Sequence, residues 1–144
     1  MLRTNRRVLA GVLIVGLQTA ACRHEPEAAR HDPPARVERR EGSSIARVIL
    51  SAKAVERLGI QTAPIREASG ARRTLIPYAA LIYDLHGDTW AYTNPEPLVF
   101  VRERIRVDRI EGEVVALSDG PSPGTPVVTV GAAELFGVEF GVGK

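Results

Sequence analysis

Residues 98–110, LVFVRERIRVDRI, form the longest run of strand-forming residues in this sequence. From residue 101 on, aliphatic side chains recur on one side of an extended chain, at Val101, Ile105 and Val107. The other side carries charges, at Arg102, Arg104, Arg106 and Asp108. A period of two residues is typical of a strand with one face on a hydrophobic core. The stretch therefore predicts a long, half-buried β-strand.

Shorter segments of the same kind recur along the chain, with turns roughly every eight to twelve residues. Strands are predicted at residues 46–50, 60–65, 72–83, 89–93, 114–117 and 127–130. Pro77 divides the third of these segments with a bend, and Pro64 assigns the second to the edge of a sheet. A hairpin turn is predicted at residues 84–88, where Gly87 supplies a positive φ.

One short helix is predicted among the strands, at residues 51–59. Ser51 is a good N-cap residue, and Gly59 is a natural C-terminal stop. Residues 132–136 suit one further helical turn. Many short strands around one short helix predict an all-β domain, a small sandwich or barrel-like domain of antiparallel strands.

The N-terminus has the layout of an export signal. Three arginines precede a short apolar run at residues 8–17, and small residues lead from there to the only cysteine, Cys22. The run is shorter than the roughly 20 residues of a membrane-spanning helix. We expect residues 1–21 to be a lipoprotein-type signal peptide and Cys22 to carry lipid. The alternative is an incidental cysteine after an ordinary cleavage site, because Thr19 stands where such signals usually have leucine.

Residues 22–44 are rich in charge and proline and contain one large aliphatic side chain, Val37. Such a segment buries too little apolar surface to offset the ordering of its backbone. We therefore expect a disordered tether at residues 22–44, a folded domain at 45–138 and a short tail at 139–144. This organisation predicts a domain that is lipid-anchored on the periplasmic side of the cell envelope.

The charge of the chain argues against nucleic acid as a partner. The formal net charge is +2, from 19 basic and 17 acidic residues. Without the three arginines of the signal, 16 basic residues face 17 acidic ones, a net charge of −1. The rest of the chain therefore lacks the basic excess that is typical of nucleic-acid binding.

Residue patterns of catalysis and metal binding are not found in the sequence. The three histidines, His24, His31 and His86, are not paired at the spacing of a zinc site. No serine stands in a nucleophile elbow, and no glycine-rich phosphate loop follows a predicted strand. We expect a protein that is not an enzyme, uses no cofactor and holds no metal.

The row formed by Arg102, Arg104 and Arg106 is the most distinctive polar feature of the predicted strands. It suits docking to an acidic partner or to anionic lipid. The alternative is an exposed face that pairs with carboxylates across the sheet. We take these three arginines as candidate partner-binding residues. For Trp90 and Tyr92, which share one side of their strand, packing against the core is the simpler role.

Three longer stretches carry a resemblance to a known family. They are IPYAALIYDLHGDTWAYT (76–93), LVFVRERIRVDRIEGEVVALS (98–118) and GPSPGTPVVTVGAAEL (120–135). Together they resemble the C-terminal, membrane-proximal part of periplasmic adaptor subunits, or membrane fusion proteins, of resistance-nodulation-division efflux pumps. The matching positions are Ile76, Pro77, Ala80, Leu81, Trp90, Tyr92, Gly120, Gly124, Val127, Val128 and Gly131. Pro121 departs from the leucine that is usual in the family.

The resemblance implies a non-catalytic domain that contacts an inner-membrane efflux transporter or other adaptor subunits. Residues 46–65 are similar to a further adaptor stretch that precedes the barrel or pairs with the end of the chain. The long helical hairpin and the lipoyl-like segments of a full adaptor have no counterpart in the sequence. We therefore expect an accessory role in efflux. The alternatives are a stand-alone periplasmic module that binds a metal or small ligand, and a remnant of a longer adaptor.

Overall fold

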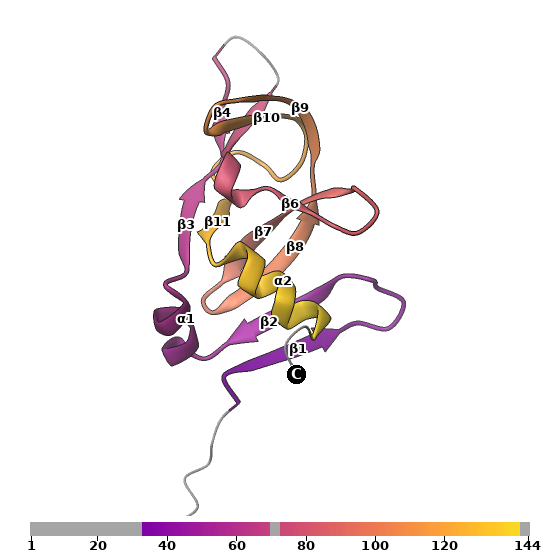
Figure 1. The fold of residues 1–144 in the computed structure, drawn as a ribbon, viewed down its shortest axis with the longest axis vertical. Coiled ribbons are helices and arrows are strands. Elements are labelled where there is room, and N and C mark those ends of the chain that lie inside the picture. The colour runs from indigo at the N-terminus through magenta and orange to yellow at the C-terminus, as the bar shows by residue number, and fades with distance from the viewer. Residues whose placement is uncertain (1–32, 70–72, 142–144) are drawn as a thin grey trace, which may run out of the picture. The chain divides into compact units, whose positions relative to one another are not determined.

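The computed structural model describes residues 33–69 and 73–141 of the 144-residue chain (Figure 1). The strands are β1 (Ala35–Arg39), β2 (Ala46–Leu50), β3 (Gln61–Pro64), β4 (Arg66–Glu67), β5 (Thr74–Pro77), β6 (Ile82–Tyr83), β7 (Thr89–Glu96), β8 (Val99–Arg104), β9 (Arg106–Glu111), β10 (Val114–Asp119) and β11 (Pro126–Val130). The helices are α1 (Ala52–Leu58), a short 3-10 turn η1 (Tyr78–Ala80) and α2 (Ala132–Phe140). The predicted all-β fold is confirmed.

The strands form two antiparallel sheets. The larger sheet runs β1-β2-β8-β7-β11-β3, with β6 paired to β7, and the smaller runs β4-β5-β10-β9. Tight hairpins join β7 to β8 and β9 to β10, and the second of these turns at Gly112, whose φ is 57°. The strand that ends at Pro64 is at an edge of the larger sheet, as the sequence predicts.

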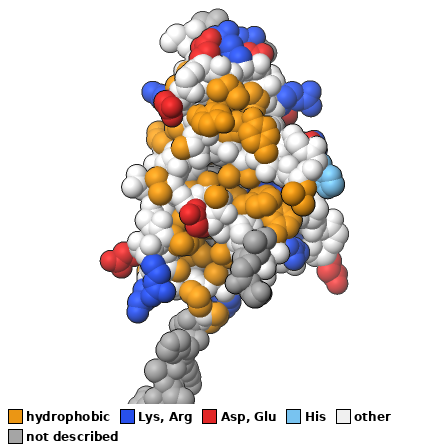
Figure 2. All heavy atoms as spheres, viewed as in Figure 1, with side chains coloured by type: hydrophobic (Ala, Val, Ile, Leu, Met, Phe, Trp, Pro, Cys, Tyr) orange, Lys and Arg blue, Asp and Glu red, His pale blue; other side chains and the backbone are white. Residues whose placement is uncertain are grey.

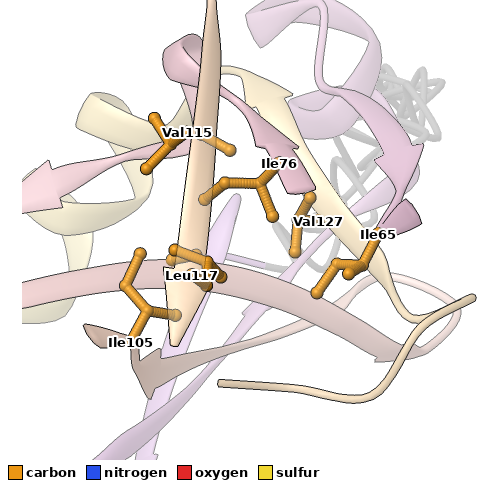
Figure 3. Packing of buried hydrophobic residues seen from close by; sticks show 8 residues of the cluster. Ile65, Ile76, Ile105, Val115, Leu117 and Val127 are labelled. Carbon is orange, nitrogen blue, oxygen red and sulfur yellow. The ribbon is translucent and has the colours of Figure 1, made fainter. Parts of the chain in front are cut away.

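Two hydrophobic clusters fill the space on the two sides of the larger sheet. One joins it to the smaller sheet and contains Ile65, Ile76, Ala80, Ala91, Ile105, Val115, Leu117 and Val127 (Figure 3). The other lies under the helices and contains Val48, Leu50, Tyr92, Phe100, Val128, Ala132 and Leu135. Trp90 and Tyr92 share the helix side of the larger sheet with Arg102, whereas Ala91 between them belongs to the other cluster.

Helix α1 has the ends that its sequence predicts. The Ser51 hydroxyl accepts a hydrogen bond from the backbone N–H of Ala54, and Gly59 ends the helix in the left-handed conformation at φ 62°. The hairpin turn before β7 also has its glycine at positive φ, with Gly87 at 82°. Strand β7 continues to Glu96, beyond the predicted end at residue 93, and turns there into β8.

The prediction of a disordered tether over residues 22–44 is wrong for residues 33–44. Residues 35–39 form β1, which pairs with β2 with Val37 opposite Val48. Ladder hydrogen bonds satisfy the backbone of an edge strand, so little apolar side chain is needed to order it. The Arg39 guanidinium also donates a 2.9 Å hydrogen bond to the carbonyl oxygen of Glu139. Residues 1–32, with the predicted signal peptide and Cys22, lie outside the described part of the chain.

The predicted boundary at residue 138 is also wrong. Helix α2 continues through Phe140, four residues beyond the helical turn expected at residues 132–136. Leu135 and Glu139, one turn apart, both face the larger sheet and are buried. The folded unit therefore includes residues that the sequence assigned to a tail.

The predicted long strand at residues 98–110 is two strands in different sheets. Ile105 separates β8 from β9, and its side chain packs between the sheets. Its backbone N–H donates to the carbonyl oxygen of Thr89 at 3.0 Å. Alternation of side chains could not reveal this change of sheet, because the chain is extended on both sides of it.

Candidate functional site

A cavity of about 460 Å³ opens beside helix α2, where side chains of three segments meet. The segments are the turn between β6 and β7, the second half of α2, and the connection from β1 to β2, and strands β7 and β8 lie beneath them. The lining residues are Ser44, Asp84, Leu85, His86, Trp90, Arg102, Phe136 and Phe140. Figure 2 shows hydrophobic side chains gathered on the face of the molecule that carries α2. Most of the lining is therefore aromatic or aliphatic.

Asp84 shapes the turn that forms one wall of the cavity. Its Oδ1 accepts hydrogen bonds from the backbone N–H groups of His86 and Asp88, both at 2.9 Å, and its Oδ2 accepts one from the Trp90 indole at 3.0 Å. This arrangement fixes the turn and the Trp90 ring together. It leaves the Leu85 side chain 98 % exposed at the tip of the turn.

Hydrogen bonds also set the charge state of Asp84. Desolvation by itself would raise the pKa of this carboxyl group, but the bonds from Trp90, His86 and Asp88 outweigh it, and the pKa lies below its ordinary value of 3.8. Asp84 is therefore ionised at neutral pH, and three N–H donors already satisfy it.

Arg102 lies between two aromatic rings beneath the cavity. Its guanidinium carbon is 4.0 Å from the centroid of the Trp90 ring and 5.1 Å from that of Phe140. The residue is 5 % exposed. Arg102 pairs with Glu139, with Nε and Oε2 3.3 Å apart and a 3.3 Å hydrogen bond from Nη2 to Oε1.

Glu139 is the buried carboxylate that links α2 to the sheet, and 2 % of its surface is exposed. Besides its ion pair with Arg102, it accepts a 2.5 Å hydrogen bond from the Tyr92 hydroxyl. Burial, followed by this bond and the negative charge of Glu139, raises the pKa of Tyr92 far above its ordinary value of 10.0. Tyr92 therefore stays protonated and remains a donor to Glu139.

The start of α2 sets the position of this network. Gly131 precedes the helix at φ 88°, and a Cβ atom there would lie 2.2 Å from Cδ1 of Ile60. The close approach of this backbone to Ile60 brings Leu135 into the core. Because residues four apart lie on the same face of a helix, Glu139 faces the sheet together with Leu135. For the same reason Phe136 and Phe140 lie next to each other, with their ring centroids 4.6 Å apart.

The three arginines proposed from sequence do not form one exposed row. Arg102 is buried in the ion pair with Glu139, whereas Arg104 is exposed at the end of β8 and pairs with Asp88. Arg106 is exposed on β9, in the other sheet. Arg102 and Arg104 do share one face of β8, because both guanidinium groups lie over the Trp90 ring. The expectation of a shared face is wrong for Arg106, because the chain changes sheet at Ile105.

Glu139, Phe136 and Phe140 belong to the site but were not predicted from the sequence. The spacing of the two phenylalanines, four residues apart, was a signal for one face of a helix. Glu139 gave no such signal, because its partners lie on β7 and β8, far away in sequence. Cys22 and two of the histidines, His24 and His31, lie outside the described residues.

Two further observations concern metals and membranes. Within residues 33–69 and 73–141, no three His, Cys, Asp or Glu side chains gather as a metal ion would require. No helix in the described part of the chain has the length and apolar character to cross a membrane.

Comparisons of this chain with protein-family models, with curated proteins and with solved structures found no match. The site offers aromatic faces, one buried guanidinium and an imidazole at the rim to a bound molecule.

Proposed function

We propose that this chain is a non-catalytic, lipid-anchored protein of the periplasmic side of the cell envelope. Its β-domain serves a transmembrane efflux transporter as an accessory binding domain, without cofactor, metal or nucleic acid. The observation that carries the proposal is the order of elements after Pro77. A hairpin leads into the aromatic strand β7, which is followed by the charged strands β8 and β9, the hydrophobic strand β10, a glycine-containing loop and a last hydrophobic strand, β11. Apart from the division of the charged stretch into β8 and β9, this order agrees with the one that the resemblance to efflux adaptors implies.

Several residues that carry the resemblance also pack together in the fold, which supports treating the three stretches as parts of one domain. Ile76, Ala80 and Val127 belong to a single cluster between the sheets. Val128 lies in the cluster under α2, together with Tyr92. Gly131 is required at the start of α2 by its positive φ and its contact with Ile60.

Strand β9 is the surface that suits a protein partner best. It is the outer strand of the smaller sheet, and among the described strands it pairs with β10 alone. Its exposed side chains include Arg106 and Arg109, and Arg104 is exposed at the preceding end of β8. An edge strand offers unpaired backbone groups to a partner, and the charges add selectivity. Arg102 is too deeply buried to take part directly.

Photo-crosslinking in living cells tests the proposal. A photoreactive amino acid at Arg106 or Arg109 is expected to give an adduct that mass spectrometry identifies as an efflux transporter or an adaptor subunit. The matched control is Lys53, which is exposed on α1, outside this surface. A different class of protein in the adduct, no adduct, or equal adducts at Lys53 would contradict the proposal.

Charge reversal sharpens the same test. The double variant Arg104→Glu and Arg106→Glu is expected to lower recovery of the partner several-fold, because charges at the rim of an interface govern encounter and selectivity. Lys53→Glu is expected to leave recovery unchanged.

The lipid anchor has its own test. Labelled palmitate is expected to be incorporated into the wild-type chain but not into the Cys22→Ser variant.

A further inference from the structure

The cavity beside α2 has the size and lining of a small-molecule site. Its volume of about 460 Å³ falls within the range of about 300–1,000 Å³ that is usual for such sites. Trp90 and Phe136 present apolar surface to the cavity, and Phe140, 48 % exposed, stands at its rim. Leu85, at the tip of the β6–β7 turn, also lines the cavity and is 98 % exposed. An isolated exposed leucine is ordinary, but this one flanks an aromatic cavity.

The charges of the cavity are already balanced. Arg102 is paired with Glu139, and Asp84 is satisfied by three N–H donors. Among the described residues that line the cavity, no free group of opposite sign is placed to neutralise the charge of a charged ligand. Desolvation of that charge would therefore oppose binding.

Hydrogen-bonding capacity remains on the guanidinium. Among the described residues, the only hydrogen bond from the guanidinium of Arg102 goes from Nη2 to Glu139. Its Nε is buried and lies 3.3 Å from Oε2 of Glu139, so it faces the carboxylate. A guanidinium carries five N–H donors. The group is thus held between two rings, and the N–H groups of Nη1, which bond to none of the described residues, are left for an acceptor in the cavity.

We propose that this cavity binds an uncharged, flat aromatic molecule that accepts a hydrogen bond from Arg102. Aromatic faces of Phe136, Phe140 and Trp90 pack against the ring system of the ligand. The balanced Arg102–Glu139 pair excludes charged analogues. The proposal does not rest on the efflux function, because it depends on the side chains of the cavity alone.

The single tryptophan of the chain gives a direct readout, because Trp90 lines the cavity. In a two-dimensional NMR spectrum of the isotope-labelled full chain, its indole N–H gives one resolved signal. Naphthamide, an uncharged aromatic probe with one acceptor, is expected to shift that signal saturably. Naphthoate and naphthylmethylammonium, the anionic and cationic counterparts, are expected to bind at least about tenfold more weakly. Equal or tighter binding of either charged probe would overturn the assignment of ligand class.

Variants locate the site. Phe140→Ala is expected to weaken naphthamide binding roughly tenfold, since it removes one aromatic wall. Tyr78→Ala is the matched control, because Tyr78 is similarly exposed at 45 % and does not line the cavity. Methylnaphthalene, which lacks the acceptor, is expected to bind several-fold more weakly than naphthamide. Equal loss in both variants, or no saturable shift with naphthamide, would refute the proposal.

Discussion

Glu139 is the residue on which the helix side of the domain depends. A carboxylate in the last turn of a helix faces the negative end of the helix dipole, and its burial adds a desolvation cost. Arg102 and the Tyr92 hydroxyl offset both effects by direct contact. Arg39 further satisfies the main-chain carbonyl of the same residue. Side chains from strands β1, β7 and β8 thus all bond to the same residue of α2, Glu139.

Replacing Glu139 is expected to destabilise the fold strongly. Glu139→Ala leaves Arg102 as an unpaired buried charge, which costs about 3–5 kcal/mol of unfolding free energy. Glu134→Ala removes an exposed carboxylate from the same helix and is expected to cost less than about 1 kcal/mol. Urea denaturation of both variants measures the difference. Similar losses of unfolding free energy in the two variants would show that the buried Arg102–Glu139 pair contributes no more to stability than an exposed carboxylate does.

Tyr92 makes stability depend on pH in the alkaline range. Burial, and then the bond to Glu139, raises the pKa of this hydroxyl in the folded state above 10.0, so the unfolded chain loses this proton first. The contribution is complete below pH 10.0 and falls by about 1.4 kcal/mol per pH unit above it. Unfolding free energies across that range are expected to show this slope. Tyr92→Phe should reduce it, whereas Tyr78→Phe should not.

Helix α2 depends on the glycine before it as much as on its own side chains. Gly131 has φ 88° and lies against Ile60, so it combines a left-handed backbone with a close approach. Gly137, inside the same helix, has open space where a Cβ atom would stand, with no neighbouring atom within 4 Å. The backbone conformation and packing thus require glycine at position 131, whereas at position 137 there is room for a side chain.

Alanine at these two glycines is expected to act in opposite directions. Gly131→Ala should cost about 1–2 kcal/mol from the left-handed backbone alone, and displacement of Ile60 should add to it. Gly137→Ala should stabilise the helix by about 0.5–1 kcal/mol, because alanine favours a helix interior. Thermal unfolding of the two variants provides the comparison. A stabilised Gly131→Ala variant would contradict the packing of α2 described above.

Strand β1 shows the limit of composition as a guide to an element. Residues 35–39 carry three charges and one valine, a content that predicts disorder. They form a strand because β2 offers a complementary edge and Val37 lies opposite Val48. Order here comes from a partner in the sheet and not from the segment itself. Local sequence predicted α1 correctly, because its caps act within a few residues.

Across the folded domain, the larger sheet is shared by two hydrophobic clusters. Leu117 belongs to the cluster between the sheets, whereas Tyr92 belongs to the cluster under the helices. Alternate side chains of β7 enter different clusters, so loss of one cluster removes support from the other. This arrangement predicts cooperative unfolding of both sheets and α2.

Leu117→Ala tests that coupling. Leu117 is fully buried, so the substitution is expected to lower the free energy of unfolding by about 2–5 kcal/mol. Fluorescence of Trp90, which lies on the opposite side of the larger sheet, should report the same denaturant midpoint as circular dichroism of the strands. Separate midpoints would mean that the two clusters unfold independently.

Local sequence was enough to predict most of the strands and turns and helix α1, because these depend on alternation, caps and glycines within a few residues. The placement of the charges, in contrast, depends on contacts between distant parts of the chain. Arg102 and Arg104 are two residues apart on one strand, yet one is buried and the other exposed. The reason is a carboxylate 37 residues away, Glu139, which neutralises Arg102 beneath a helix. The cavity beside that helix likewise exists only because distant segments meet there.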